Sequence, residues 1–356
     1  MKESKERMSK PITIADIARL AGVSPSTVSR VLNGSKRVAE EKRLQVLAAG
    51  EQFQFRPNAI ARGLVRGRSM LIGVLVQDIV SPFFGQLVQG IEQGLMPGEY
   101  QPMLTTTHWR STDPDEEIRA LQLLLDRQVD GLIVLAGRIP DEQLREVAKQ
   151  LPLIVVTRKI AGLEQQCITI DNQQAAYRVT RYLLGLGHTR IAHIAGASDH
   201  PDAIDRLIGY RRALSDAGIP YNEGLVVPGY FTSESGLLGI EELLARGEQF
   251  SAVFASNDDT AYGVMLGLYN HGYHIPGDIS VVGFDDQLHA AYTLPPLTTM
   301  RQPAIDMGRM AAEGMLRLLD GKDAQLPAIT PELVIRKSAQ RLRLLARATE
   351  LNVDDS

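Results

Sequence analysis

The stretch TIADIARLAGVSPSTVSRVLNG, residues 13–34, decides the fold of the first part of the chain. Its first half places apolar residues at the i, i+3, i+4 and i+7 positions of one helix face, namely Ile14, Ile17, Ala18 and Ala21. Thr13 can cap the start of that helix, with Asp16 near the positive end of the helix dipole. Gly22 then permits a turn. These features predict a short helix that ends in a turn.

The second half of the same stretch predicts another short helix. Ser24 suits the N-cap, and Pro25 occupies the first helical position, where its missing N–H costs nothing. The inward-facing positions are Val28, Val31 and Leu32. The Asn-Gly pair at 33–34 ends the helix, and a third helix is expected from about 40 to 53. Two short helices joined by a glycine-containing turn form a helix-turn-helix.

The exposed side chains of the second predicted helix suit nucleic acid. Hydroxyls near a helix N-terminus can contact phosphate, and arginine matches the paired acceptors of guanine. The exposed side chains are those of Pro25, Ser26, Thr27, Ser29 and Arg30. Residues 1–70 hold 14 Lys and Arg against 6 Asp and Glu, whereas the remaining chain holds 24 against 36. A basic arm on an acidic body favours a phosphate contact over the alternative of a merely soluble basic tail.

Beyond residue 70 the sequence pattern changes to that of an α/β protein. Short apolar runs rich in Val and Ile are typical of buried parallel strands; they are MLIGVLV, VDGLIVLA, LPLIVVT, RIAHIAG, FSAVFAS and ISVVGF. Amphipathic stretches such as DPDEEIRALQLLLDRQ and AYRVTRYLLGLG lie between them. This alternation continues over roughly 270 residues, which is too long for one ordinary sheet.

Several classes of protein are excluded by composition and motifs. No run of about 18 apolar residues is present, and the N-terminus MKESKERMSK lacks a secretory h-region, so a cytoplasmic protein is expected. Cys167 is the only cysteine, which excludes an internal disulfide and a cysteine-based zinc site. The sequence has no HExxH, Walker loop or GxSxG elbow. We therefore expect no catalytic residue, no metal site and no cofactor.

The chain resembles the LacI/GalR family of bacterial transcription regulators. The resemblance rests on residues 13–34, on FRPNAIARGL, and on the later stretches VDGLIVL, GHTRIAHIAG, AVFASNDDTAYGV, DISVVGFDD and PPLTTMRQP. It implies a helix-turn-helix domain over 1–56, whose second helix reads the major groove, and a hinge helix over 57–69. The implied base contacts are Pro25, Ser26 and Arg30, the implied phosphate contacts are Thr27, Ser29 and Asn33, and the hinge supplies Asn58 and Leu64.

Leu64 is the residue that matches the family's minor-groove wedge. Apolar wedges between base steps kink DNA, and Arg62 and Arg66 could hold the phosphates on either side. Gly63 and Gly67 make the hinge a poor helix by itself, since an interior glycine costs about 1 kcal/mol relative to alanine. We therefore expect the hinge to become helical only on DNA.

The same resemblance implies a core of two Rossmann-like lobes of the periplasmic-binding-protein type over 70–340, followed by a tail at 341–356. The chain is expected to cross between the lobes near 169–172, 298–302 and 332–335. A ligand would bind between them, outside the carboxyl ends of the strands. The implied effector residues are Asp78, Phe83, Phe84, Arg206, Phe231, Asn257, Asp285 and Gln302.

Alternative interpretations of these residues stay open. Arg206 and Asp285 could form a structural salt bridge, Asp258 and Asp286 could be helix caps, and at least one of Phe83 and Phe84 could be structural. Other positions depart from the family pattern. Thr157 stands where sugar-binding relatives often carry aspartate, Arg158 could favour an anionic ligand, and His200 replaces an arginine of purine-binding relatives.

The function expected from the sequence is that of a homodimeric repressor of carbohydrate-utilisation genes. It would bind double-stranded operator DNA and respond to a small sugar. A purine- or nucleoside-responsive regulator is the first alternative, and a stand-alone solute-binding protein is a remote one. The tail leucines at 342, 344, 345 and 351 keep no heptad, so a dimer is expected rather than a tetramer.

Overall fold

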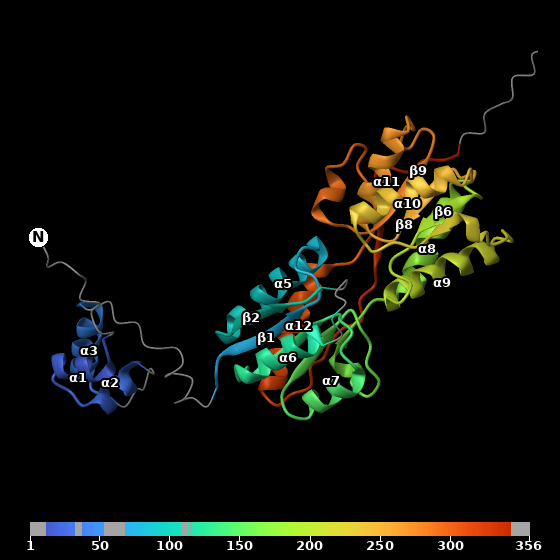
Figure 1. Ribbon diagram of the computed structural model, residues 1–356. Coiled ribbons are helices and arrows are strands. Elements are labelled where there is room, and N and C mark those ends of the chain that lie inside the picture. The colour runs from blue at the N-terminus through green and yellow to red at the C-terminus, as the bar shows by residue number, and fades with distance from the viewer. Residues whose placement is uncertain (1–11, 33–37, 53–67, 109–112, 114, 343–356) are drawn as a thin grey trace, which may run out of the picture.

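The computed structural model describes residues 12–32, 38–52, 68–108, 113 and 115–342 (Figure 1). The predictions for Asn33, Asn58 and Leu64 therefore lie outside the described residues, as do most of the hinge and the tail. In the part of the chain that is described, no helix has both the length and the apolar character needed to cross a bilayer.

The first described unit is the predicted helix-turn-helix with its third helix. Helix α1 (Ile14–Leu20) begins in a capping box between Thr13 and Asp16. Helix α2 (Pro25–Leu32) follows a turn in which Gly22 has φ +62°. Helix α3 (Glu40–Gln52) continues through Gly50, so that glycine does not break it. One small core joins the three helices, with Ile17, Ala18, Ala21, Val28, Val31, Val46 and Ala49 buried.

The first lobe of the core is built on a five-stranded, all-parallel sheet in the order β2-β1-β3-β4-β5. Its strands are β1 (Leu71–Val76), β2 (Gln101–Thr106), β3 (Gly131–Leu135), β4 (Leu153–Val156) and β5 (Cys167–Ile168). Its helices are α5 (Pro82–Leu95), α6 (Glu116–Asp126), α7 (Asp141–Ala148) and α12 (Ala304–Leu319). Three of these strands, β1, β3 and β4, were predicted from their apolar runs.

Helix α12 returns to the first lobe although it lies more than 130 residues after β5, and it packs beside α5 (Figure 1). Glycines permit the close approach of these two helices. A Cβ on Gly90 would lie 2.0 Å from the carbonyl oxygen of Ile305, and a Cβ on Gly308 would lie 2.0 Å from that of Leu87. Nothing larger than glycine fits at these two positions without moving a backbone.

The second lobe holds a six-stranded sheet in the order β11-β10-β9-β8-β6-β7, in which only β11 is antiparallel to its neighbour. Its strands are β6 (Ile191–Ile194), β7 (Val226–Val227), β8 (Ala252–Ala255), β9 (Ser280–Asp285), β10 (Thr298–Arg301) and β11 (Glu332–Val334). Its helices are α8 (Asn172–Gly185), α9 (Pro201–Asp216), α10 (Ser233–Ala245) and α11 (Asp258–Asn270).

The chain passes between the lobes three times. The connections are residues 169–171, 302–303 and 320–331, as the order of strands and helices requires. The resemblance implied crossings near 169–172, 298–302 and 332–335. Because β10 and β11 belong to the second sheet, the second connection begins only at 302 and the third ends at 331. An isolated parallel bridge pairs Ile170 with Ile329 and holds two of the connections together.

Candidate functional site

Helix α2 presents a polar face to solvent. Pro25, Ser26 and Arg30 are exposed, and Thr27 and Ser29 are half-buried beside them. The three residues implied to contact bases are therefore more exposed than two of the residues implied to contact phosphate. The described side chains leave the start of α2 open to an approaching surface.

The start of α2 is held by Ser24, as its sequence predicted. The backbone N–H of Thr27 donates to Ser24 Oγ at 3.2 Å, and the same hydroxyl oxygen lies 2.8 Å from Ser26 Oγ. Because hydroxyl protons rotate, both hydroxyls can exchange this local bond for a phosphate oxygen. The geometry suits the implied contact with a DNA backbone.

A cavity of about 190 Å³ lies between the two lobes of the core. All eight effector residues implied by the sequence line it: Asp78, Phe83, Phe84, Arg206, Phe231, Asn257, Asp285 and Gln302. Three of them come from the first lobe and five from the second lobe and its connection. The structure thus brings together residues that are more than 220 positions apart in sequence.

The ends of parallel strands explain why these residues meet. Asp78 follows β1, Asn257 follows β8, Asp285 ends β9 and Gln302 follows β10. The carboxyl ends of parallel strands open at one edge of a sheet, and ligands of doubly wound folds bind outside that edge. Each lobe contributes one such edge to the cavity.

Four lining residues adopt left-handed backbone conformations that non-glycine residues rarely adopt. They are Ala136, Thr157, Phe231 and Asp285, with φ of 61°, 69°, 60° and 114°. Each such residue costs on the order of 1–3 kcal/mol, and such conformations persist where the surrounding structure enforces them. Their gathering at one cavity favours a binding role for it.

Arg206 is 3% exposed and forms part of the wall without a salt bridge to Asp285. Its Nε donates to Asn172 Oδ1 at 2.9 Å, and its Nη1 donates to the carbonyl oxygen of Ser256 at 2.6 Å. Its guanidinium carbon lies 3.7 Å from the centre of the Phe284 ring. Among the described residues no carboxylate is paired with Arg206 within 4.0 Å. The remaining guanidinium N–H groups are therefore available to a ligand.

Burial shifts the pKa values of three titratable groups near Arg206. Burial raises the pKa of Asp285 to about 7, although the charge of Arg206 and a hydrogen bond from Gln302 Nε2 at 2.7 Å both oppose the shift. Burial likewise raises the pKa of Asp202 to about 6. His200 caps α9, and burial lowers its pKa to about 4, so its ring is neutral at pH 7. Both Asp202 and His200 line the cavity.

Asn257 has a positioning role as well as a place on the wall. It is the N-cap of α11, since its Oδ1 accepts from the backbone N–H of Thr260 at 2.9 Å. Its Nδ2 donates to the carbonyl oxygen of Phe231 at 3.0 Å, which helps to hold that residue in its left-handed conformation. One Nδ2 proton remains for a ligand.

The phenylalanines that line the cavity differ in their burial and in their contacts. Phe83 and Phe84 meet edge to face with ring centres 5.5 Å apart. Phe83 is buried in the core of the first lobe, whereas Phe84 is half-buried at its margin. Phe231 lies against Gly196, where a Cβ would come within 2.1 Å of the Phe231 Cζ. This glycine sets how far the Phe231 ring can withdraw from the cavity.

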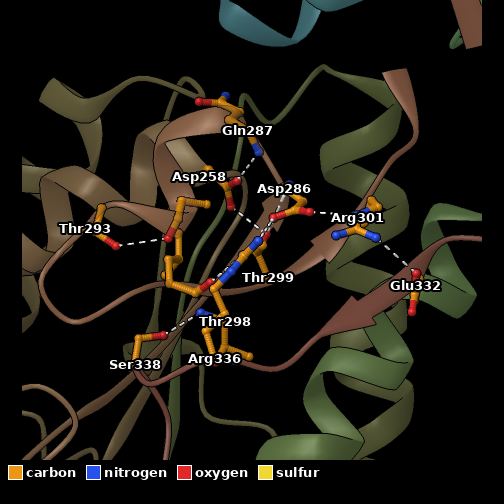
Figure 2. Close-up of polar contacts among 12 residues, drawn as sticks. Asp258, Asp286, Gln287, Thr293, Thr298, Thr299, Arg301, Glu332, Arg336 and Ser338 are labelled. Carbon is orange, nitrogen blue, oxygen red and sulfur yellow. Dashed lines mark hydrogen bonds and ion pairs between the residues drawn. The ribbon is translucent and has the colours of Figure 1, made fainter. Parts of the chain in front are cut away.

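Asp258 and Asp286 do not line the cavity but fix the segment that follows β9 (Figure 2). The Asp258 carboxylate accepts from the backbone N–H of Gln287 at 2.7 Å and from Thr299 Oγ1 at 2.6 Å. Asp286 pairs with Arg301 and with Arg336. These bonds join α11, β9 and β10, so both aspartates are structural, and neither is the N-cap of a helix.

Several lining residues were not singled out from the sequence: Gln77, Ser81, His108, Ala136, Asp202, Tyr230 and Thr232. Gln77 is 2% exposed, and its Oε1 has no hydrogen-bond partner in the described part of the chain. Its place directly after an apolar strand run was a usable signal. Arg158 lies outside this cavity, because its guanidinium donates to the carbonyl oxygen of Gly137 at 2.9 Å and pairs with Asp141.

Comparisons with known proteins agree with this organisation. Residues 13–58 match the family model for bacterial regulatory proteins of the lacI family, and residues 180–339 match a periplasmic binding protein-like domain. The transcriptional regulator GalR of Escherichia coli is 40% identical over 92% of this chain and 95% of its own length.

Two solved structures extend the comparison to three dimensions. The Lac repressor dimer bound to operator and an anti-inducer is 27% identical and covers 93% of this chain and all of its own, with a TM-score of 0.83. The CelR–cellobiose complex is 32% identical over 92% of this chain and all of its own, with a TM-score of 0.68. Because the similarity runs through the helix-turn-helix and both lobes, this chain belongs to the LacI family of bacterial regulatory proteins, DNA-binding transcriptional regulators rather than enzymes.

Proposed function

We propose that this protein is a homodimeric repressor of carbohydrate-utilisation genes, acting on operator DNA in the cytoplasm, and that a small sugar switches its DNA binding. The observation that carries the proposal is the lining of the interlobe cavity. Phe84 and Phe231 offer apolar faces for the C–H surface of a sugar ring. Arg206 supplies a planar set of donors and Asp285 a pair of acceptors, which together match neighbouring hydroxyls.

The position of the cavity supplies the switch. A sugar held by Phe84 of the first lobe and Arg206 of the second binds most tightly when the lobes have one particular separation. A ligand shifts an equilibrium only through such differential affinity for two states. The segment that would pass this shift to the DNA is the predicted hinge at 57–69, in which Leu64 is the proposed minor-groove wedge.

Dimer formation is supported by exposed apolar side chains on the second lobe. Leu266 and Tyr269 on α11 are exposed, and so are Tyr292 and Leu294 after β9, with Leu294 93% exposed. Exposed apolar side chains favour association of protein chains where they gather into one patch. A two-fold dimer would also place two copies of α2 on the two halves of a pseudo-palindromic operator.

The test is an operator-release assay with full-length protein and labelled DNA from its own promoter region. Binding should weaken steeply with added salt, because phosphate contacts release counterions. Arg206→Ala should raise the sugar concentration that releases DNA at least about tenfold and leave DNA affinity intact. Arg212→Ala is the matched control, since Arg212 lies on the same helix with its side chain on Gln174 and Tyr177. Release by nucleosides alone would refute the sugar assignment.

A further inference from the structure

We propose that the effector contains at least two linked sugar units, and that the second unit occupies a separate cavity beside the connections between the lobes. This inference rests on the proposed function. The second cavity has a volume of about 950 Å³. It is lined by both lobes and by the connections between them, including Thr169, Asp171 and Ile329.

The two cavities are neighbours with a shared wall. Ala136, Thr157, His200 and Asp202 line both of them. A ligand whose first ring lies against Phe231 and Arg206 in the inner cavity would reach the outer one by passing His200 and Asp202. Small-molecule sites usually enclose about 300–1,000 Å³. The inner cavity of about 190 Å³ falls below that range, which favours a ligand that also uses the outer cavity.

The outer cavity has walls of opposite charge. Arg138, Arg158 and Lys159 line it from the first lobe, while Asp199, Asp202 and Asp205 line it from the second. Some of these groups are already engaged. Arg158 pairs with Asp141, and Asp205 accepts from Gln173 Nε2 at 2.7 Å.

Two of the charged groups are left for an occupant. Lys159 and Asp199 are exposed and have no hydrogen-bond or ion-pair partner within the described ranges. A ligand with net charge of either sign would be attracted by one wall and repelled by the other, so the cavity as a whole favours neither an anion nor a cation. A neutral polyol suits both walls, because each hydroxyl can donate to a carboxylate and accept from a cationic N–H.

The outer cavity also connects the ligand to the lobe crossing. Asp171 lies in the first connection, and the next residue, Asn172, links the two cavities. Its Oδ1 accepts from Arg206 Nε at 2.9 Å, and its Nδ2 donates to Asp202 Oδ1 at 3.0 Å. A second sugar unit would therefore contact the first and third connections, whereas a ring confined to the inner cavity meets only the second connection, at Gln302.

The experiment measures affinity and melting temperature of the full-length protein with disaccharides and with their component monosaccharides. The probes are cellobiose, lactose, maltose, sucrose and trehalose, each beside glucose, galactose or fructose. At least one disaccharide should bind about tenfold or more tightly than its own monosaccharides, since one added hydrogen bond to a charged group has that effect. A bound ligand also raises the melting temperature.

Variants of the outer wall separate the two subsites. Lys159→Ala and Asp199→Asn should each weaken that disaccharide about tenfold and leave the affinity of its monosaccharide within twofold. Lys322→Ala and Asp320→Asn are matched controls, because this exposed ion pair lies at the end of α12 and lines neither cavity.

The outcomes distinguish this inference from the proposed function. Equal affinity for a disaccharide and its monosaccharide, or unchanged disaccharide affinity in both wall variants, would overturn the second subsite and leave a sugar effector standing. Stabilisation by guanine, hypoxanthine or their nucleosides alone, or by none of the sugars, would overturn both.

Discussion

Replacing Asp285 by asparagine should remove much of the pH dependence of the stability of the ligand-free core. Burial raises the pKa of this carboxyl from 3.8 to about 7. The difference of about three pKa units corresponds to about 4 kcal/mol, at about 1.4 kcal/mol per unit. Because the folded pKa lies above the unfolded one, this stability is fully present below pH 3.8 and is lost as the pH rises through about 7.

The assay is urea unfolding at pH 5, 6, 7 and 8, followed by circular dichroism. About 2.5 kcal/mol of the Asp285 contribution is lost between pH 5 and pH 8. Over this range the free energy of unfolding of the wild type should therefore decrease by about 2.5 kcal/mol more than that of Asp285→Asn. Asp306→Asn is the control, because Asp306 is exposed and paired with Arg309 on the same helix. Equal pH profiles for wild type and Asp285→Asn would refute the reasoning.

The affinity for sugar should depend on ionisation of the same carboxyl, but it should rise with pH whereas the stability falls. A ligand hydroxyl that donates to Asp285 favours the ionised carboxylate, so affinity should rise with pH and level off above about 7. Below that pH the affinity should fall by up to about tenfold per pH unit. Asp285→Asn should bind weakly with a flat profile, measured by calorimetry at each pH.

Three further substitutions test the cavity and the hinge. Gly196→Ala should drive the Phe231 ring into the cavity and abolish sugar binding in calorimetry while operator affinity is kept; Gly185→Ala, which meets no atom within 4 Å, should change neither. Glu117→Gln should weaken sugar binding about tenfold. The Glu117 carboxylate accepts from the backbone N–H groups of residues 138 and 139, at 2.5 and 3.0 Å, and so holds the loop that follows Ala136 of the cavity wall. An unchanged dissociation constant would contradict this expectation. Leu64→Ala should reduce operator affinity and bend angle in gel-shift assays and leave sugar binding intact.

Local rules account for the parts of the fold that were predicted. The start of α1 follows from Thr13 and Asp16, and the start of α2 from Ser24 and Pro25, because capping acts over three or four residues. Six inner strands, β1, β3, β4, β6, β8 and β9, were visible because a parallel strand buried on both faces is a continuous apolar run. The edge strands β2, β5, β7 and β11 and the inner strand β10 lack that pattern and were not identified.

The family resemblance implied which residues line the candidate site, but it did not imply their contacts. Polar residues after strand runs, such as Asn257, must gather at the carboxyl edge of a parallel sheet. Nothing local indicates that Arg206 bonds to Asn172 and Ser256 instead of pairing with Asp285. Those partners are 34 and 50 residues away, and their distance depends on how helices pack on the sheet.

The sequence by itself determined the helix-turn-helix and the α/β class of the core, because periodicity and capping are properties of neighbouring residues. The eight cavity residues were implied by the family resemblance instead. Tertiary structure alone decided that α12 returns to the first lobe, where Gly90 and Gly308 allow two backbones to touch. It also decided the left-handed conformation of Phe231, the perturbed carboxyl of Asp285 and the second cavity beside the connections. Those features depend on burial and on contacts between distant segments, which exist only once the chain is packed.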